Sequence, residues 1–298
     1  MENSLAIVGA GRVGRALGRR LRELGWKIGA VITRGEASAR RAVRFIGAGK
    51  PHARMTRQIL ASHVILIATP DDEVARVAQE LARIGAEELH GKVVLHTSGA
   101  LDARALEPVK AYGAAVGSMH PLQSFSGVAV PSLEGRVFAV EGEAPAIRVA
   151  RQIARMLGGS PVRIADGKKV LYHAAATMAA AHVLAVEEAA TQLMASLGMR
   201  RNQAVRALLM LTRQVLDNLE QLGPRAAWTG PLSRGDYKVV AAHFEAVRES
   251  RDEFSQALDA LNRLAARVLA QDADGMLAEL EKISAGKKPK AKVMGSDG

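Results

Sequence analysis

Apolar residues recur with two different periods along this chain, and the change of period divides it into two parts. In the first part, short apolar runs alternate with stretches of helical periodicity. The runs cover residues 5–9, 27–33, 63–69, 92–98, 113–118 and 136–140. Strands that alternate with helical stretches are typical of βαβ units, so the pattern predicts a mostly parallel sheet with helices on its faces. We therefore expect an α/β domain over residues 1–163.

The strand pattern disappears from Asp166 onward. Long segments rich in Ala and Leu follow, at residues 167–198, 200–222, 236–270 and 274–284. Glycines and Gly-Pro pairs stand between these segments, and such punctuation is typical of helix ends. The pattern predicts an all-α C-terminal domain over residues 164–285. The last stretch, 286–298, is short, polar and basic, and we expect it to be a disordered tail.

Composition narrows the chemistry that is possible. The chain has 298 residues and no cysteine, which excludes disulfides, thiolate catalysis and cysteine-based zinc sites. No group of His, Asp and Glu has the spacing of metal ligands, so we predict no metal. The formal charge is +11, but the arginines are spread along the chain and no nucleic-acid-binding motif is present. We therefore predict an anionic small-molecule ligand and no nucleic acid.

The sequence also indicates in which cellular compartment the protein is found. The N-terminus runs directly into the first predicted strand, without the charged and apolar regions of a signal peptide. The longest Ala-rich stretch, Tyr172–Ala190, contains two histidines and two glutamates, which makes it a poor membrane span. We expect a cytoplasmic protein that has no membrane partner.

A glycine motif follows the first predicted strand and opens a helical stretch. It has the form G-x-G-x-x-G, and in this context it is typical of a Rossmann dinucleotide site. Gly9 permits a tight turn, Gly11 leaves room for a pyrophosphate beside the backbone, and Gly14 lets the helix pack closely on the strand. The N-terminus of that helix supplies free N–H groups to the phosphates. The predicted dinucleotide-binding residues here are Gly9, Gly11, Arg12, Val13 and Gly14.

The end of the second predicted strand bears on the choice of cofactor. NAD-binding proteins usually place an acid about 20 residues after the motif, where it binds the ribose 2′-hydroxyl. In this chain Thr33 and Arg34 stand there, and Glu36 comes two residues late. A guanidinium makes paired hydrogen bonds to a 2′-phosphate. We therefore predict NADP(H) in preference to NAD(H), although Arg34 would also suit a solvated strand end.

Two further strand ends carry polar and turn residues. Thr69 and Pro70 follow one predicted strand, and Ser98 and Gly99 follow the next. In open α/β sheets the ligand lies outside the carboxyl ends of the strands, so these residues are candidates for lining the cofactor groove. Turn chemistry alone would explain each of them equally well.

Several short motifs, in this order, resemble proteins that combine a Rossmann-like domain with a DUF2520 domain. They are GAGRVG (9–14), ATPDD (68–72), HTSGA (96–100), GSMHPLQSF (117–125), KVLYHAAA (169–176) and TGPLSRGD (229–236). That group is similar to ketopantoate reductase, pyrroline-5-carboxylate reductase, 3-hydroxyisobutyrate dehydrogenase and prephenate dehydrogenase. The resemblance implies hydride transfer between NAD(P)H and a small carbonyl, imine or hydroxy compound, in a homodimer formed through the helical domain. One position departs from the family pattern, because His182 replaces an Asn.

The resemblance also suggests a catalytic lysine. Lys169 and His173 are four residues apart, hence on one face of a helix. Their spacing is similar to the Lys-x-x-x-Asn of the 3-hydroxyisobutyrate dehydrogenase and ketopantoate reductase relatives, in which the lysine is the acid/base and the Asn orients substrate. We predict that Lys169 is a solvent-accessible ammonium in the interdomain cleft that donates a proton, and that His173 lines the site. A surface lysine beside a core-edge histidine is the alternative.

His120 is a second candidate for acid/base chemistry, because imidazole titrates near neutral pH. It precedes Pro121 in a turn that is similar to the His-Pro turn of prephenate dehydrogenases. Gln123 and Ser124 add polar groups that are candidates for substrate binding. Arg234, in the helical domain, is a further candidate for binding a substrate carboxylate, although we favour a structural role.

Three functions are compatible with these observations. The first is an NADP(H)-dependent oxidoreductase that reduces a small keto- or imino-acid type substrate. The second is a prephenate dehydrogenase-like oxidation that uses His120. The third is an NADP(H) sensor that catalyses nothing. The sequence does not identify a substrate, because the pocket side chains come from loops.

Overall fold

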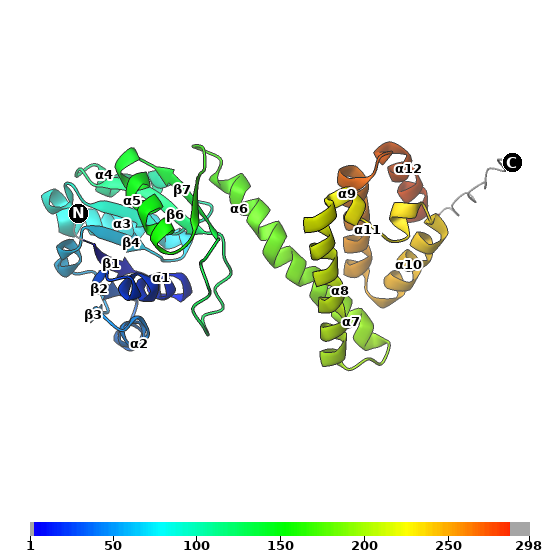
Figure 1. Cartoon of the computed structure of the whole chain (residues 1–298), viewed down its shortest axis with the longest axis horizontal. Coiled ribbons are helices and arrows are strands. Elements are labelled where there is room, and N and C mark those ends of the chain that lie inside the picture. Colours follow the sequence, from blue (N-terminus) through cyan, green and yellow to red (C-terminus); the bar gives the residue numbers. More distant parts are fainter. Residues whose placement is uncertain (1–2, 287–298) are drawn as a thin grey trace. The chain divides into compact units, whose positions relative to one another are not determined.

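The computed structural model describes residues 3–286. One eight-stranded sheet forms the centre of its first part (Figure 1). The strands are β1 (Ser4–Val8), β2 (Lys27–Ile32), β3 (Lys50–His52), β4 (Val64–Ile67), β5 (Val93–His96), β6 (Ala115–Pro121), β7 (Val137–Gly142) and β8 (Ser160–Arg163). Their order in space is β3-β2-β1-β4-β5-β6-β7-β8, and only β6 and β7 pair antiparallel. The first six follow the Rossmann order, which confirms the predicted doubly wound, mostly parallel fold.

Two of these strands, β3 and β8, were not expected from the sequence. Both are short and lie at the edges of the sheet, and each contains a proline, Pro51 in one and Pro161 in the other. Proline lacks the N–H that a central strand must donate, so it is found mainly in edge strands. The same feature obscures the strand pattern in the sequence.

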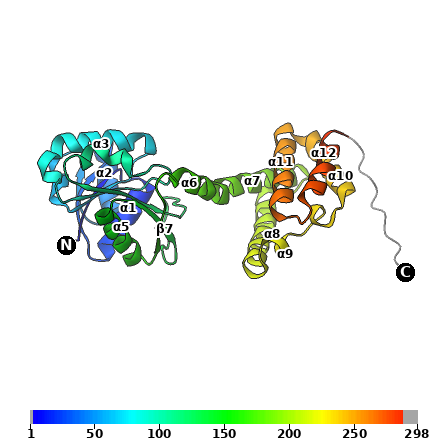
Figure 2. The same cartoon turned by 90° about the horizontal axis from the view of Figure 1, so that it is seen from above.

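Helices cover both faces of the sheet. Buried side chains of α1 (Arg12–Glu23), α2 (Glu36–Ile46) and α5 (Ala144–Met156) pack on one face, and those of α3 (Asp71–Gly85) and α4 (Glu107–Lys110) pack on the other (Figure 2). Because successive strand residues point to opposite faces, β1 supplies Leu5 and Ile7 to one core and Ala6 and Val8 to the other. Short 3₁₀ turns complete this part: η1 (Arg57–Ala61), η2 (Ala86–Leu89) and η3 (Ala103–Leu106).

The remaining described residues are helical, which confirms the predicted all-α C-terminal region. The elements are α6 (Lys169–Thr177), the π-helical turn η4 (Met178–His182), α7 (Val183–Ser196), α8 (Arg201–Leu222), α9 (Pro224–Ala227), η5 (Leu232–Arg234), α10 (Tyr237–Ser250), α11 (Asp252–Leu269) and α12 (Ala273–Ser284). The predicted helix over 236–270 is divided in two, because Arg251 adopts an extended conformation with φ −155° and ψ 134°.

The chain divides into two compact units, Met1–Ala181 and His182–Gly298. Helix α6 therefore groups with the Rossmann unit, although the predicted domain boundary lies between residues 163 and 164. The side chain of Lys169, the first residue of α6, explains this grouping, because it is buried against β6 and the turn after β5. Apart from Gly286, the predicted disordered tail lies outside the described residues.

Within the described residues, one helical stretch, Lys169–Ser196, is by length and composition alone able to cross a membrane. An 18-residue window of it has a mean hydropathy of 1.3. A single stretch of this kind is weak evidence, and this one begins with a charged residue that is buried in the Rossmann unit. The expectation of no membrane partner stays a prediction.

Candidate active site

The glycine motif forms a turn whose geometry depends on the absence of side chains. Gly9 has φ +85°, and a Cβ there would lie 2.6 Å from the backbone N of Thr69. A Cβ on Gly14 would lie 2.6 Å from the carbonyl oxygen of Gly9. Around Gly11 there is open space, with no atom within 4 Å of a built Cβ. The turn thus packs tightly at two of its glycines and leaves the third open, where a ligand has access to the backbone.

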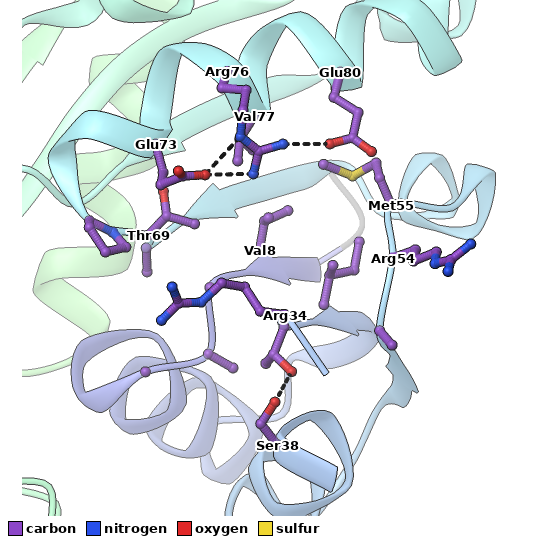
Figure 3. Close-up of a pocket in the computed structure, with 18 residues that line it drawn as sticks. Val8, Arg34, Ser38, Arg54, Met55, Thr69, Glu73, Arg76, Val77 and Glu80 are labelled. Atoms are coloured by element: carbon purple, nitrogen blue, oxygen red, sulfur yellow. Dashed lines mark hydrogen bonds and ion pairs between the residues drawn. The ribbon is translucent and has the colours of Figure 1, made fainter. Parts of the chain in front are cut away.

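A pocket of about 560 Å³ lies beside this turn, at the carboxyl ends of β1, β2 and β4 (Figure 3). Gly9, Gly11, Arg34, Thr69 and Pro70 line it, as the sequence predicts for a cofactor groove. Its volume is typical of a small-molecule site. The Thr69 Oγ1 is buried and has no hydrogen-bond partner. A buried hydroxyl of this kind needs a partner, and a ligand in the pocket would supply one.

The part of this pocket beside β2 is built from hydroxyl and guanidinium groups. The Thr33 hydroxyl lies 2.6 Å from the Ser38 hydroxyl and donates to the Gly35 carbonyl at 3.0 Å, which orders the turn into α2. Arg34 and Arg54 are both exposed and both line the pocket. Arg34 directly precedes Gly35, the N-cap of α2, and a cation beside a helix N-terminus favours a phosphate.

The opposite wall of the pocket carries one cation that is paired with two carboxylates. Arg76 of α3 lies 2.5 Å from Glu73 and 3.3 Å from Glu80, as the dashed lines in Figure 3 show. With Arg76 paired in this way, Arg34 and Arg54 are left as the cationic side of the pocket.

A second cluster lies at the carboxyl ends of β5 and β6, and Lys169 is at its centre. Its side chain is 1% exposed, and its Nζ donates to the Ser98 carbonyl at 2.8 Å and to the Ser118 hydroxyl at 3.1 Å. The Ser98 hydroxyl donates in turn to Asp71 Oδ2 at 2.8 Å. Asp71 is the first residue of α3 and directly follows Pro70 of the pocket. This bond joins the second cluster to the wall of the nucleotide pocket.

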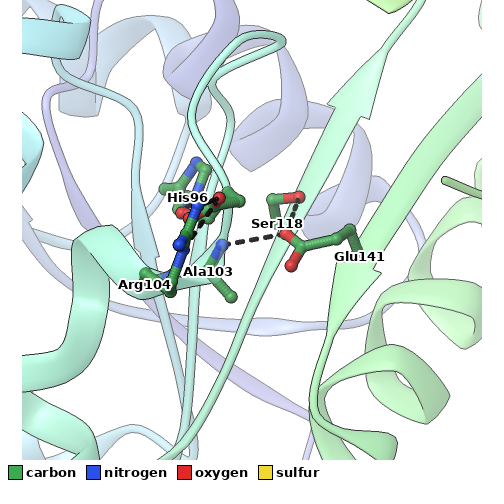
Figure 4. A network of polar contacts seen from close by, with 6 residues as sticks. His96, Ala103, Arg104, Ser118 and Glu141 are labelled. Atoms are coloured by element: carbon green, nitrogen blue, oxygen red, sulfur yellow. Dashed lines mark hydrogen bonds and ion pairs between the residues drawn. The ribbon is translucent and has the colours of Figure 1, made fainter. Parts of the chain in front are cut away.

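Figure 4 shows a network of polar contacts that includes Ser118, which Lys169 contacts, and Glu141. Glu141 is 6% exposed, and its Oε2 accepts a hydrogen bond from the Ala103 backbone N–H at 2.8 Å and one from the Ser118 hydroxyl at 3.3 Å. His96 is fully buried. Its Nδ1 accepts from the Ser98 N–H at 3.2 Å, so its Nε2 carries the hydrogen and donates to the Asp102 carbonyl at 3.1 Å.

His120 lies at the more accessible side of this cluster. Its Nδ1 is 2.8 Å from the hydroxyl of Tyr172, and its ring lies edge-on to the ring of His173 at 5.8 Å between centroids. Gly99 makes this arrangement possible, because a Cβ there would lie 2.4 Å from His173 Cδ2 and 3.0 Å from His120 Nε2. Two imidazoles and a phenol thus close around one backbone turn.

Burial shifts the pKa values of these groups. It lowers the pKa of His120 to about 4, and the charge of Lys169 acts in the same direction. It also lowers the pKa of Lys169 to about 8, against the pull of Glu141. Burial raises the pKa of Tyr172 to about 12. At neutral pH the imidazole of His120 is therefore neutral, the phenol keeps its proton and Lys169 is an ammonium.

The structure brings some of the predicted site residues together and not others. Lys169, His120, His173, Ser98 and Gly99 form one cluster. One expectation is corrected, because the ammonium of Lys169 is buried and hydrogen-bonded rather than solvent-accessible. Burial follows from the helix start, which directs the side chain between the turn after β5 and the strand β6.

Three predicted substrate-binding residues lie elsewhere. Gln123 and Ser124 are in the loop between β6 and β7. Arg234 is in the helical unit, where its Nε lies 3.1 Å from Asp236 Oδ2. Asp236 stands at the N-cap of α10, and its side chain makes no cap hydrogen bond. Their roles toward a substrate stay predictions.

Sequence reasoning missed several groups that the fold places in the site. Tyr172 lies inside the motif KVLYHAAA, three residues after Lys169, and this helical spacing is a signal that would have found it. Glu141 is an acid within the otherwise apolar strand β7, which is also a readable signal. Arg54 follows the unexpected strand β3, so nothing in the sequence pattern pointed to it.

Two family models match most of the chain. Residues 2–121 match the Rossmann-like domain, and residues 136–267 match DUF2520, a domain of unknown function. The chain joins a Rossmann-like domain to a DUF2520 domain. This confirms the resemblance seen in the sequence. Among curated proteins, none matches this sequence.

Solved structures share the fold of this Rossmann-like/DUF2520 protein. Protein TM1727 from Thermotoga maritima is 26% identical, with a TM-score of 0.68 over 89% of this chain and 97% of the other. A reductive aminase from Aspergillus terreus, in complex with NADPH and ethyl-5-oxohexanoate, is 18% identical, with a TM-score of 0.63 over 95% and 93%. A pyrroline-5-carboxylate reductase from Coxiella burnetii is 13% identical, with a TM-score of 0.57 over 95% and 98%. At these low identities the last two show a common fold.

Proposed function

We propose that this Rossmann-like/DUF2520 protein is an NADP(H)-dependent oxidoreductase that reduces a small keto- or imino-acid type substrate. The observation that carries the proposal is the Ser98–Asp71 hydrogen bond, which makes the nucleotide pocket and the His120 cluster neighbours at one edge of the sheet. In open α/β sheets this edge is where ligands bind. The reductive aminase with NADPH and the pyrroline-5-carboxylate reductase support the reaction class by analogy of fold.

The residues of the pocket fit the proposed cofactor. Gly9, Gly11 and Gly14 would hold the pyrophosphate against the backbone, and the unpartnered Thr69 hydroxyl would gain a hydrogen bond. Thr33, Ser38, Arg34 and Arg54 would hold a 2′-phosphate. When it is bound, the reduced nicotinamide supplies the hydride.

In this proposal His120 and Tyr172 handle the proton. The Tyr172 hydroxyl donates to Nδ1 of the neutral imidazole, so Nε2 carries a hydrogen that it donates to the substrate oxygen or nitrogen. As negative charge develops on that atom, the Nε2 proton moves to it, and the Tyr172 proton moves to Nδ1. The resulting tyrosinate, with a pKa of about 12, is a weaker base than an alkoxide and regains its proton from water.

The same pair of residues also supports the second function predicted from the sequence. An imidazole that is neutral at working pH is able to take a proton from a hydroxyl group during oxidation, as in a prephenate dehydrogenase-like reaction. Assays in both directions separate the two functions. The third function, an NADP(H) sensor, predicts cofactor binding without turnover on any substrate.

The test combines cofactor binding with a substrate panel. We expect NADPH to bind and its absorbance to fall with at least one keto acid or cyclic imine. His120→Gln and Tyr172→Phe should each lower kcat by roughly 10²–10⁴-fold and leave NADPH affinity within a few fold. Tyr112→Phe, an exposed tyrosine, is the matched control. Normal turnover in the His120→Gln variant would exclude this mechanism.

We propose further that the protein is a cytoplasmic homodimer that associates through its helical unit. Many large apolar side chains of this unit are exposed. On α7 and α8 they are Val183, Leu184, Val186, Leu209, Met210, Leu211, Val215, Leu216, Leu219 and Leu222. An apolar surface of this extent is typical of an interface, and a second copy of the same surface is the simplest partner.

A further inference from the structure

The mechanism proposed above leaves two buried charged groups without a role, and they lie next to each other. The Lys169 ammonium is 1% exposed and the Glu141 carboxylate is 6% exposed. The hydroxyl of Ser118 connects them, because it accepts from Lys169 Nζ at 3.1 Å and donates to Glu141 Oε2 at 3.3 Å. Burying a charge is costly unless it is paired, so this line of three groups needs an explanation.

Lys169 is poorly placed to be the proton donor that the resemblance implies. Two of its three N–H groups are engaged, one on the Ser98 carbonyl at 2.8 Å and one on Ser118. Ser98 stands in the turn that carries Gly99, and Gly99 packs against the imidazoles of His120 and His173. The ammonium is therefore hydrogen-bonded to the same backbone turn, Ser98–Gly99, against which the His120 imidazole packs.

The charges around His120 come from three elements. Lys169 and His173 belong to α6, His96 belongs to β5 and Asp71 begins α3. The ammonium opposes protonation of His120, and the Asp71 carboxylate favours it. Among the charged neighbours of His120, Lys169 has the largest effect on its pKa, second only to burial.

The charges around Lys169 are all acidic. Glu141 of β7 has the largest effect, followed by Asp71 and by Asp102, which precedes η3. The Asp102 carboxylate is already engaged with Arg104 at 2.6 Å. The Asp71 carboxylate accepts the Ser98 hydroxyl. Glu141 accepts from the same hydroxyl that Lys169 contacts, that of Ser118, whereas Asp71 accepts from the Ser98 hydroxyl and Lys169 contacts the Ser98 carbonyl.

We propose that Glu141 is a positioning residue, which through Ser118 holds the Lys169 ammonium on the Ser98 carbonyl, so that this fixed charge adds to burial in opposing protonation of His120. Lys169 is then an electrostatic and positioning group rather than the acid. The inference rests on the proposed function only in taking His120 as the reacting group, and its test requires no substrate.

The test is a pair of NMR titrations on the full chain without cofactor or substrate. Histidine ring resonances, assigned with His120→Gln, report on His120, and ¹³C,¹⁵N-labelled lysine reports on Lys169. In the unmodified protein His120 should stay neutral down to about pH 5. Lys169→Met should raise the titration midpoint of His120 by at least about half a pH unit. Glu141→Gln should lower the titration midpoint of Lys169, because the largest opposing charge is removed.

Glu143→Gln is the matched control. Glu143 lies two residues after Glu141 and also accepts a backbone N–H, that of Val116 at 3.0 Å, but it contacts Lys110 and not Lys169. It should change neither titration. If Lys169→Met does not fold, the titration of Lys169 in the Glu141→Gln variant is the test.

Two results would overturn the inference. One is a His120 midpoint in Lys169→Met within about 0.2 units of the unmodified protein. The other is a Lys169 shift in Glu141→Gln no larger than in Glu143→Gln. A protein that shows the expected titrations but turns over no substrate would contradict the proposed function and leave this inference intact.

Discussion

The two units of the molecule treat charged and apolar side chains in opposite ways. In the Rossmann unit, three titratable side chains, those of His96, Glu141 and Lys169, are buried, and the sheet is covered on both faces. In the helical unit, the ion pairs lie at the surface, as between Arg201 and Glu188, whose side chains are 61% and 42% exposed. Its apolar core is small, and much of its apolar surface is exposed.

This difference indicates which unit carries the reacting site and which unit carries an interface. A buried charge has a perturbed pKa and a fixed geometry, which are properties that a reacting site requires. An exposed ion pair is screened by solvent and contributes little to stability, whereas an exposed apolar face gains free energy when a partner covers it. We therefore assign the reaction to the first unit and dimerisation to the second. The following predictions test this contrast.

The largest expected effect comes from removing a buried charge. Lys169→Met leaves the Glu141 carboxylate buried without a cation, and breaking a buried pair in this way costs about 3–5 kcal/mol of unfolding free energy. Adding Glu141→Gln should recover part of this loss, since no buried charge is then left uncompensated. Urea denaturation of the single and double variants measures both values.

The matched change in the helical unit is Arg201→Met. Because the Arg201–Glu188 pair is exposed, its loss should cost less than about 1 kcal/mol. Equal costs for the two single variants would contradict the contrast between the units.

The next effect is a loss of stability in acid that comes from the Rossmann unit. Burial lowers the pKa of His96 to about 4 from an ordinary value of 6.5, so between these values the unfolded chain binds a proton that the folded protein does not. Stability should therefore fall as the pH drops from about 6.5 to 4, by up to about 3 kcal/mol from this residue, and His96 should have no effect above pH 7.

Urea denaturation at about pH 7 and at about pH 5 measures how steeply the free energy of unfolding changes with pH. His96→Gln should flatten it, whereas His243→Gln, an exposed histidine of the helical unit, should leave it unchanged. An identical slope in the His96 variant would show that other groups cause the acid sensitivity.

The same contrast explains what the sequence was able to predict. Most of the Rossmann strands are buried on both faces and read as continuous apolar runs, so these strands and the glycine turn were predictable, whereas the edge strands β3 and β8 were not. The site depends on contacts between residues far apart in the chain, such as Lys169 with Ser98, and periodicity carries no information about these. That the Lys169 side chain is buried followed only from the fold.

A smaller effect is expected at the surface of α8. Leu211 is 63% exposed, and burying a leucine side chain contributes about 1.5–3 kcal/mol. Leu211→Glu should therefore weaken the proposed dimer by at least about tenfold, and light scattering across a dilution series measures this. Val128→Glu, at an 89% exposed position of the Rossmann unit, is the control. A monomer mass for the unmodified protein at micromolar concentration would contradict the proposed dimer.

The smallest effect concerns exposed charges of the Rossmann unit, at the nucleotide pocket. Arg34 and Arg54 are both solvent-facing, so each contributes less than a buried charge, but a bidentate contact to a 2′-phosphate is still worth about 1.5–3 kcal/mol. We expect NADPH to bind at least about tenfold more tightly than NADH. Arg34→Ala should abolish most of this preference by weakening NADPH binding and leaving NADH binding unchanged. Arg54→Ala should act in the same direction.

Arg40→Ala provides the control for that last change, because Arg40 lies on α2, near Arg34 in sequence, but pairs with Glu36 at 2.7 Å. It should leave both dissociation constants unchanged, as fluorescence titration would report. If the unmodified protein binds NADH as tightly as NADPH, the two guanidiniums are ordinary surface charges, and the cationic side of the pocket has no part in cofactor choice. If Arg34→Ala weakens both nucleotides equally, the guanidinium contacts a part that they share, such as the pyrophosphate, and the assignment to the 2′-phosphate is wrong.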